Sequence, residues 1–114
     1  MALDNFLARV KRGEHVTFQD TIAVISAHYA YTPTRFVNGG VVNEAGQNEG
    51  SCKLFYFARL HELSQAETLG LFGDYYRKDV LENPEGSDHA NIRSFIRHGW
   101  AGIAYDETAL ARLV

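Results

Sequence analysis

The chain has 114 residues, which suits a single domain over residues 1–114 and leaves little room for a second one. Hydrophobic residues make up 46% and charged residues 22%, a mixture that excludes a largely disordered chain and is typical of a soluble globular domain. The formal net charge is -3, which argues against a general nucleic-acid-binding protein, because such proteins are usually basic.

The sequence also bears on the compartment. The single cysteine, Cys52, cannot form an internal disulfide, which favours a reducing environment. Residues 1–15 carry charges throughout and lack the apolar core of a secretory signal. No apolar run approaches the length that spans a bilayer, so no membrane partner is predicted. These features predict a cytoplasmic protein and leave open its export by a route that needs no cleaved signal.

Two helices are predicted in the N-terminal part. Over residues 3–11, apolar side chains recur at helical spacing, and Gly13 suits the end of that helix. Thr17 and Asp20 have the spacing of a capping box, which predicts the start of a second helix. That helix should end before Pro33, because proline disfavours a helical conformation in the preceding residue. Its core-facing residues are expected to be Phe18, Ile22, Ile25 and Tyr29.

The middle of the chain combines a hairpin with two further helices. β-branched residues flank the Asn-Gly-Gly sequence at residues 38–40, which predicts a small hairpin and is the strongest strand signal in the chain. Ser51 is the candidate N-cap of a helix over about residues 52–62, whose many apolar residues indicate a central position. A second capping-box pattern opens a helix over residues 64–80. Its buried stripe is expected at Leu69, Phe72, Tyr76 and Val80, with Gly70 and Gly73 inside the helix.

The C-terminal part begins with a turn over residues 83–86. Ser87 then suits the cap of a helix to about residue 98, with Gly99 as its stop. Residues 103–105 can form a short strand, and the remainder is expected as a short helix or a loose tail. Together the patterns predict an α+β fold: a mostly helical single domain of about five helices with a small β-hairpin or sheet. The inward positions of the last long helix are expected to be Ile92, Phe95 and Ile96.

Cys52 is the first candidate for chemistry. One residue after a helix cap, its sulfur would lie near the positive end of the helix dipole, which lowers the pKa of a thiol and favours the nucleophilic thiolate. A cysteine hydrolase or transferase also needs a histidine base, and His89 and His28 are the candidates. The alternative is that Cys52 is a small buried residue that packs in a helix turn.

The glycine-containing loop before Cys52 offers a second interpretation. Residues 46–50 precede a helix N-terminus, where backbone N–H groups could hold a small anion and Lys53 could supply a positive charge. The loop lacks the Gly-Lys-Ser/Thr ending of a phosphate-binding P-loop. Its glycines could equally provide the backbone conformations of a tight turn. No histidine pair has the spacing of a zinc site, so no metal and no cofactor are predicted.

Four segments of the sequence resemble the HopJ family of type III effectors. They read "TPTRFVNGG", "NEAGQNEGSCKLFYFA", "ETLGLFGDYYRKDVL" and "NPEGSDHANIRSFIRHGWAGI", and they occur in family order over roughly residues 3–105. The resemblance implies a protein of the bacterial cytoplasm that a type III system can secrete into host cells. It implies no catalytic residue, and Gln47 stands where the family pattern leads us to expect an acid.

Polar residues in these segments have no evident role in the predicted fold. They could be helix caps and turn residues, or they could converge on a pocket between the loop before Cys52 and the helix that starts at Ser87. We therefore expect a small protein that binds a host protein or a small ligand. The alternatives are a cysteine-dependent enzyme and a bacterial cytosolic protein that binds an anion at the Ser51 helix start. The candidate binding residues are Asn48, Glu49, Ser51, Lys53, Asp88, Asn91 and Arg93.

Overall fold

The computed structural model describes residues 3–113. Within that range the chain forms five α-helices, one π-helical segment (η1), one 3-10 turn (η2) and five short strands, which confirms the predicted mostly helical α+β fold. The helical elements are α1 (Leu3–Lys11), α2 (Phe18–His28), α3 (Glu49–Leu60), α4 (Gln65–Gly70), η1 (Tyr75–Val80), α5 (Ala90–His98) and η2 (Gly99–Gly102). The strands are β1 (Tyr29–Tyr31), β2 (Phe36–Asn38), β3 (Val41–Asn43), β4 (Ile103–Tyr105) and β5 (Leu110–Arg112).

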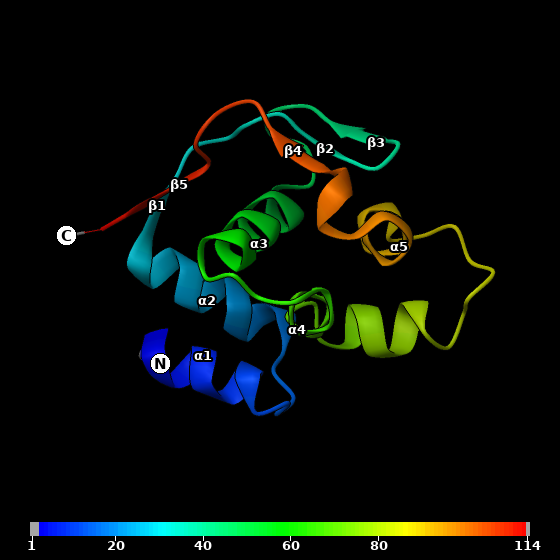
Figure 1. Cartoon of the computed structure of the whole chain (residues 1–114), viewed down its shortest axis with the longest axis horizontal. Coiled ribbons are helices and arrows are strands. Elements are labelled where there is room, and N and C mark those ends of the chain that lie inside the picture. The colour runs from blue at the N-terminus through cyan, green and yellow to red at the C-terminus, as the bar shows by residue number, and fades with distance from the viewer. Residues whose placement is uncertain (1–2, 114) are drawn as a thin grey trace.

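Helix α3 lies at the centre of the fold, between the strands on one side and α1 and α2 on the other (Figure 1). Its Phe55 is completely buried. The Phe55 ring packs against aromatic rings from four other parts of the chain, with ring centroids between 4.9 and 6.5 Å apart. These rings belong to Phe36 of β2, Phe72 after α4, Phe95 of α5 and Trp100 of η2.

Two small antiparallel sheets cover the side of α3 that faces away from α1 and α2. One has the order β3-β2-β4, so the predicted hairpin pairs its first strand with the predicted strand at residues 103–105. The other joins β1 to β5, with Ala30 opposite Ala111. The C-terminal segment is therefore a strand rather than the expected short helix or loose tail. Residues 110–112 form a strand because they pair with β1, which lies far away in the sequence.

The start of α2 forms as its sequence predicts. Thr17 and Asp20 make a reciprocal capping box, in which each side chain accepts a hydrogen bond from the other residue's backbone N–H at 3.0 and 3.1 Å. The expected buried face is only partly right, because Thr21, Val24 and Ile25 are the buried residues of the helix. The hydroxyl of Thr21 donates to the carbonyl of Leu71 at 2.9 Å, which makes burial of this polar residue tolerable.

The long helix expected over residues 64–80 is broken. Helix α4 ends at Gly70, and Gly73 adopts a left-handed conformation with φ 63° before η1 begins. A Cβ atom at Gly73 would lie 2.8 Å from the backbone nitrogen of Phe18, so the break lets this turn pack directly on the start of α2. The guanidinium of Arg77 donates to the carbonyl of Val16 at 2.8 Å and fixes the same contact.

The starts of α3 and α5 also differ from the expected positions. Helix α3 begins after Asn48 rather than Ser51, and α5 begins after His89 rather than Ser87. Both N-cap residues have left-handed backbones, with φ 49° and 52°, respectively. The stop of α5 at Gly99 is as predicted, but Ile96 is 38% exposed and does not point inward.

Within residues 3–113, no helix has the length and hydrophobicity to cross a membrane.

Candidate functional site

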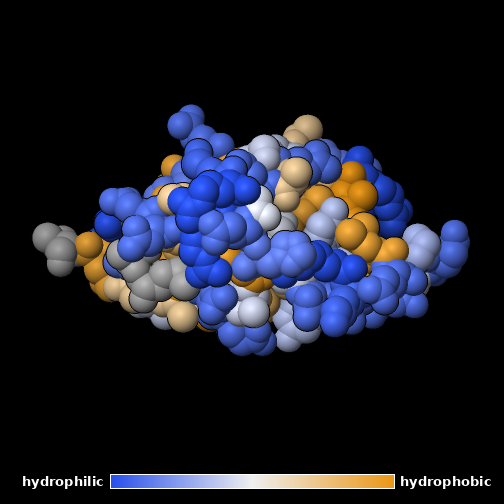
Figure 2. Space-filling view, turned by 90° about the horizontal axis from the view of Figure 1, so that it is seen from below, coloured by the Kyte–Doolittle hydropathy of each residue, from blue (hydrophilic) through white to orange (hydrophobic). Residues whose placement is uncertain are grey.

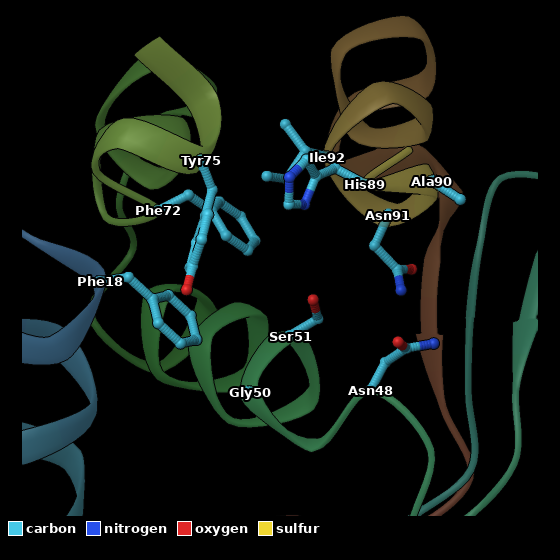
Figure 3. A pocket seen from close by; sticks show the side chains of 10 residues that line it. All are labelled: Phe18, Asn48, Gly50, Ser51, Phe72, Tyr75, His89, Ala90, Asn91 and Ile92. Atoms are coloured by element: carbon cyan, nitrogen blue, oxygen red, sulfur yellow. The ribbon is translucent and has the colours of Figure 1, made fainter. Parts of the chain in front are cut away.

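A pocket of about 340 Å³ lies where the N-termini of α3 and α5 approach the start of α2 and the beginning of η1 (Figure 3). One side of it is aromatic and the other side is polar, and the polar side comes from the first turns and caps of the two helices. The lining residues are Phe18, Asn48, Gly50, Ser51, Phe72, Tyr75, His89, Ala90, Asn91 and Ile92.

The aromatic side is a continuous wall of rings. Phe18 and Phe72 are parallel with centroids 6.2 Å apart, and Phe18 meets Tyr75 edge to face at 5.3 Å. Tyr75 in turn lies 5.3 Å from the imidazole of His89, at an interplanar angle of 35°. The absence of a side chain at Gly50 permits this arrangement, because a Cβ atom there would lie 2.6 Å from Cζ of Phe18.

The polar side exposes helix N-termini that no side chain caps. Asn48 and His89 occupy the N-cap positions of α3 and α5, but neither side chain makes a capping hydrogen bond. Helices α2 and α4, in contrast, both have complete capping boxes. The first backbone N–H groups of a helix have no acceptor within the helix, and they carry the positive end of the helix dipole. Two such ends therefore meet at one pocket.

A buried network of asparagines holds the two helix starts together. The Asn43 side-chain oxygen accepts hydrogen bonds from the amides of Asn48 at 2.7 Å and Asn91 at 2.9 Å. The amides of Asn38 and Asn43 both donate to Oδ1 of Asn91 at 3.1 Å, and Asn38 also donates to the Asn91 carbonyl. The network ties the β2–β3 hairpin to α3 and α5, so the polar side of the pocket is set by the tertiary structure.

Charged partners position His89 from outside the pocket. Its Nε2 lies 3.0 Å from a carboxylate oxygen of Asp79, on η1. The loop that carries His89 is in turn held by Arg93, whose Nη2 donates to the Asp88 carboxylate at 2.7 Å. This hydrogen bond holds the pKa of the Asp88 carboxyl below its usual value. Arg93 also donates to the carbonyls of Asp88 and Asn83 at 2.6 and 2.8 Å.

The candidate binding residues divide into two groups. Asn48, Ser51 and Asn91, together with the candidate base His89, line the pocket. Arg93 and Asp88 form an ion pair that holds the loop before α5. Glu49 is exposed in the first turn of α3. Lys53 lies 4.7 Å above the ring of Tyr31 in a cation–π contact and is not among the lining residues.

The surroundings of Cys52 do not have the features of a nucleophile. The residue is 1% exposed, and its thiol donates to the carbonyl of Thr34 at 3.6 Å. Because α3 starts before Ser51, Cys52 lies beyond the first helical positions, and its own N–H donates to the carbonyl of Asn48. Burial raises the pKa of the thiol. Among the hydrogen bonds within residues 3–113, none joins Cys52 to His89 or His28.

Several residues of the pocket were not among the candidates from the sequence. Phe18 and Phe72 were expected in the core, and Tyr75 was not among the expected core or binding residues. Asp79 and Asn43 lie behind the lining, where they contact His89 and Asn48, and neither was among the candidate binding residues. The one available signal was the occurrence of asparagines directly before or at the start of predicted helices, which is typical of residues that organise loops.

The fold and the pocket define a small α+β domain in which two uncapped helix N-termini face an aromatic wall. The chain belongs to the HopJ type III effector protein family, whose model matches residues 3–110. It is also similar to the crystal structure of VPA0580, described as an unknown function protein, with 44% sequence identity and a TM-score of 0.97. That similarity covers 99% of this chain and 95% of the other. No curated protein matches the chain.

Proposed function

We propose that this HopJ-family protein is a small binding protein whose ligand occupies the pocket between α3 and α5. The observation that carries the proposal is the meeting of two uncapped helix N-termini beside an aromatic wall in one pocket of about 340 Å³. A pocket of this size suits a small molecule or the tip of a larger one.

The two sides of the pocket specify the chemistry of the ligand. Backbone N–H groups at helix N-termini bind phosphate, sulfate or carboxylate groups, and the Ser51 hydroxyl and Asn91 amide line the same side. The rings of Phe18 and Tyr75 suit a flat apolar group, which would gain from stacking as well as from burial. We therefore infer a ligand that combines a planar ring with an anionic group.

The proposal can be tested by NMR titration of the full chain with phenyl phosphate, which combines both groups. Phenol and inorganic phosphate serve as the separate halves. We expect phenyl phosphate to bind at least about tenfold more tightly than either half, because it gains contacts on both sides of the pocket. Its largest amide shift changes should fall at residues 49–51 and 90–92.

A substitution at Gly50 provides a sharper version of the test. In Gly50→Ala the new methyl group must displace the Phe18 ring, which should weaken phenyl phosphate binding several-fold. Gly40→Ala is the matched control, because a Cβ atom there meets nothing within 4 Å. The proposal fails if ligand concentrations up to about 10 mM leave residues 49–51 and 90–92 unshifted. It also fails if both variants bind like the wild type.

The family membership supports a further part of the proposal. Its effector description suggests a protein made in the bacterial cytoplasm and delivered into a host cell by a type III system, where a host protein or small ligand would be the partner. A reporter fused to the chain and expressed in a type III-competent strain should then enter host cells. Entry that persists in a strain whose secretion system is deleted would contradict this route.

A further inference from the structure

Two adjoining hollows lie on another part of the surface, around α5 and the loop that precedes it. The first is a groove of about 290 Å³ that is lined mainly by apolar residues, which are Val80, Leu81, Pro84 and Ile96. The second is a polar hollow of about 360 Å³, and Gly40, Ser87 and His98 are among its lining residues. Gly86, Arg93 and Arg97 line both, so the two form one continuous surface, which we call the α5 groove.

The apolar part of the α5 groove is exposed to a degree that the fold does not require. Leu81 is 53% exposed and Ile96 is 38% exposed, although the helical pattern of α5 led us to expect Ile96 in the core. Both side chains line the same groove. Figure 2 shows hydrophobic side chains gathered near the end of the molecule where Figure 1 places η1. Neighbouring exposed apolar side chains in a concave surface are typical of interaction sites.

The α5 groove carries two arginines, and only one of them has a carboxylate partner among residues 3–113. Arg93 is engaged by the Asp88 carboxylate, but Arg97 has no hydrogen-bond or ion-pair partner among residues 3–113. Among residues 3–113, no carboxylate lines either hollow. The acids of the adjacent loop, Glu82 and Glu85, are exposed outside the lining. In a chain of net charge -3, the groove thus presents an unpaired cation beside an apolar surface.

We propose that the α5 groove docks a peptide segment of a partner protein, in which a large apolar side chain lies next to an aspartate or glutamate. The apolar side chain would fill the groove between Leu81 and Ile96, and the carboxylate would pair with Arg97. This interaction is independent of the ligand proposed for the pocket between α3 and α5.

Charge complementarity favours such a peptide over a second copy of this chain. In a symmetric dimer the same patch meets itself, which would bring two Arg97 guanidinium groups together without an acid from the lining. An acidic peptide instead supplies the missing carboxylate. Arginine is also enriched in protein interfaces, and its planar fork of donors matches the geometry of a carboxylate.

The test starts with a random-peptide phage library selected on the full chain and counter-selected on the double variant Leu81→Ser/Arg97→Glu. We expect the selected peptides to combine an acid with a neighbouring large apolar residue. A fluorescein-labelled peptide of the selected sequence should then lose about tenfold in affinity, measured by fluorescence anisotropy, with either single variant. Replacing its acid by lysine should restore binding to Arg97→Glu and abolish binding to the wild type.

Arg12→Glu is the matched control, because it changes the net charge equally at an exposed arginine that is not part of the groove. Circular dichroism checks that each variant is folded. Selection of no peptide that distinguishes the wild type from the double variant would overturn the proposal. So would peptides without acids, or equal effects of Arg12→Glu and Arg97→Glu. Sedimentation showing self-association that Leu81→Ser abolishes would assign the groove to a second copy instead. Arg97-dependent binding to phosphatidylserine vesicles would assign it to a membrane surface.

Discussion

Cys52 shows how burial determines the behaviour of a single side chain. The residue is 1% exposed, its thiol donates to the carbonyl of Thr34, and the hydroxyl of Tyr105 on β4 donates to its backbone carbonyl at 2.6 Å. Loss of solvation disfavours the thiolate, which is the form that reacts. The proximity to a helix start, which made the residue a candidate nucleophile, does not compensate for this burial.

We expect the native protein to react slowly with a thiol reagent such as DTNB at pH 7–8, because the thiol is both buried and protonated. The reaction should become rapid and stoichiometric in guanidinium chloride, which exposes the thiol and provides the control. Complete modification of the native protein within seconds at neutral pH would contradict this prediction. It would also revive the cysteine-dependent enzyme as a function.

At the scale of elements, the breaks and caps of helices shape the pocket more than the helices themselves. The left-handed turn at Gly73 ends the α4 segment and redirects the chain into η1, whose first residue, Tyr75, becomes part of the aromatic wall. The π-helical geometry of η1 is rare, and such segments occur frequently at functional sites. The same turn brings the backbone at residue 73 against the backbone of Phe18.

Two alanine substitutions that press on residue 18 should therefore have different effects on stability. Gly73→Ala places a side chain at φ 63° and 2.8 Å from the Phe18 backbone nitrogen, so we expect a loss of about 2–4 kcal/mol in the free energy of unfolding. Gly50→Ala presses only on the tip of the Phe18 ring, which can move, and should cost less than about 1 kcal/mol.

Guanidinium unfolding of both variants, monitored by circular dichroism, measures these losses. Gly40→Ala provides the reference for an unobstructed glycine. Equal losses in Gly73→Ala and Gly50→Ala would show that the turn at residue 73 can relax away from α2. That result would contradict the tight backbone contact on which the position of Tyr75 depends.

At the scale of the whole molecule, the asparagine network connects parts of the chain that are distant in sequence. Asn43 of β3 is completely buried and forms hydrogen bonds with both Asn48 and Asn91. Asn91 lies 48 residues after Asn43 in the sequence. Among residues 3–113, the buried Oδ1 of Asn38 is left without a partner in this network. The other members stabilise the fold because they find partners, whereas an unpaired polar group in the interior is costly. The relative position of α3 and α5, and with it the pocket, depends on this condition.

We expect Asn43→Ala to lower the free energy of unfolding by about 2–4 kcal/mol, because it removes the acceptor of the Asn48 amide and of the buried Asn91 amide, and a donor to Oδ1 of Asn91. Thermal or guanidinium unfolding measures the loss. The exposed Asn83→Ala is the control, and its effect should be small. A cost in Asn43→Ala within about 0.5 kcal/mol of the control would show that the network contributes little.

The local elements of the fold could largely be predicted from the sequence, because their signals lie within a few residues. The capping boxes at Thr17 and Ser64, the hairpin at residues 38–40 and the helix stop at Gly99 all formed as predicted. Each depends on backbone hydrogen bonds and conformational preferences that act over a single turn. The family could also be predicted from the sequence, because four segments resemble the HopJ family and the family model matches residues 3–110.

Only the tertiary structure decided the break at Gly73, the pairing of β5 with β1 and the true starts of α3 and α5. Each of these depends on a contact with a distant part of the chain: the start of α2, the strand after α2, or the asparagine network. Sequence patterns identified Asn48, Ser51 and Asn91 as candidate binding residues and His89 as a candidate base. Their assembly into one pocket opposite Phe18 and Tyr75 followed from long-range packing, which no local pattern encodes.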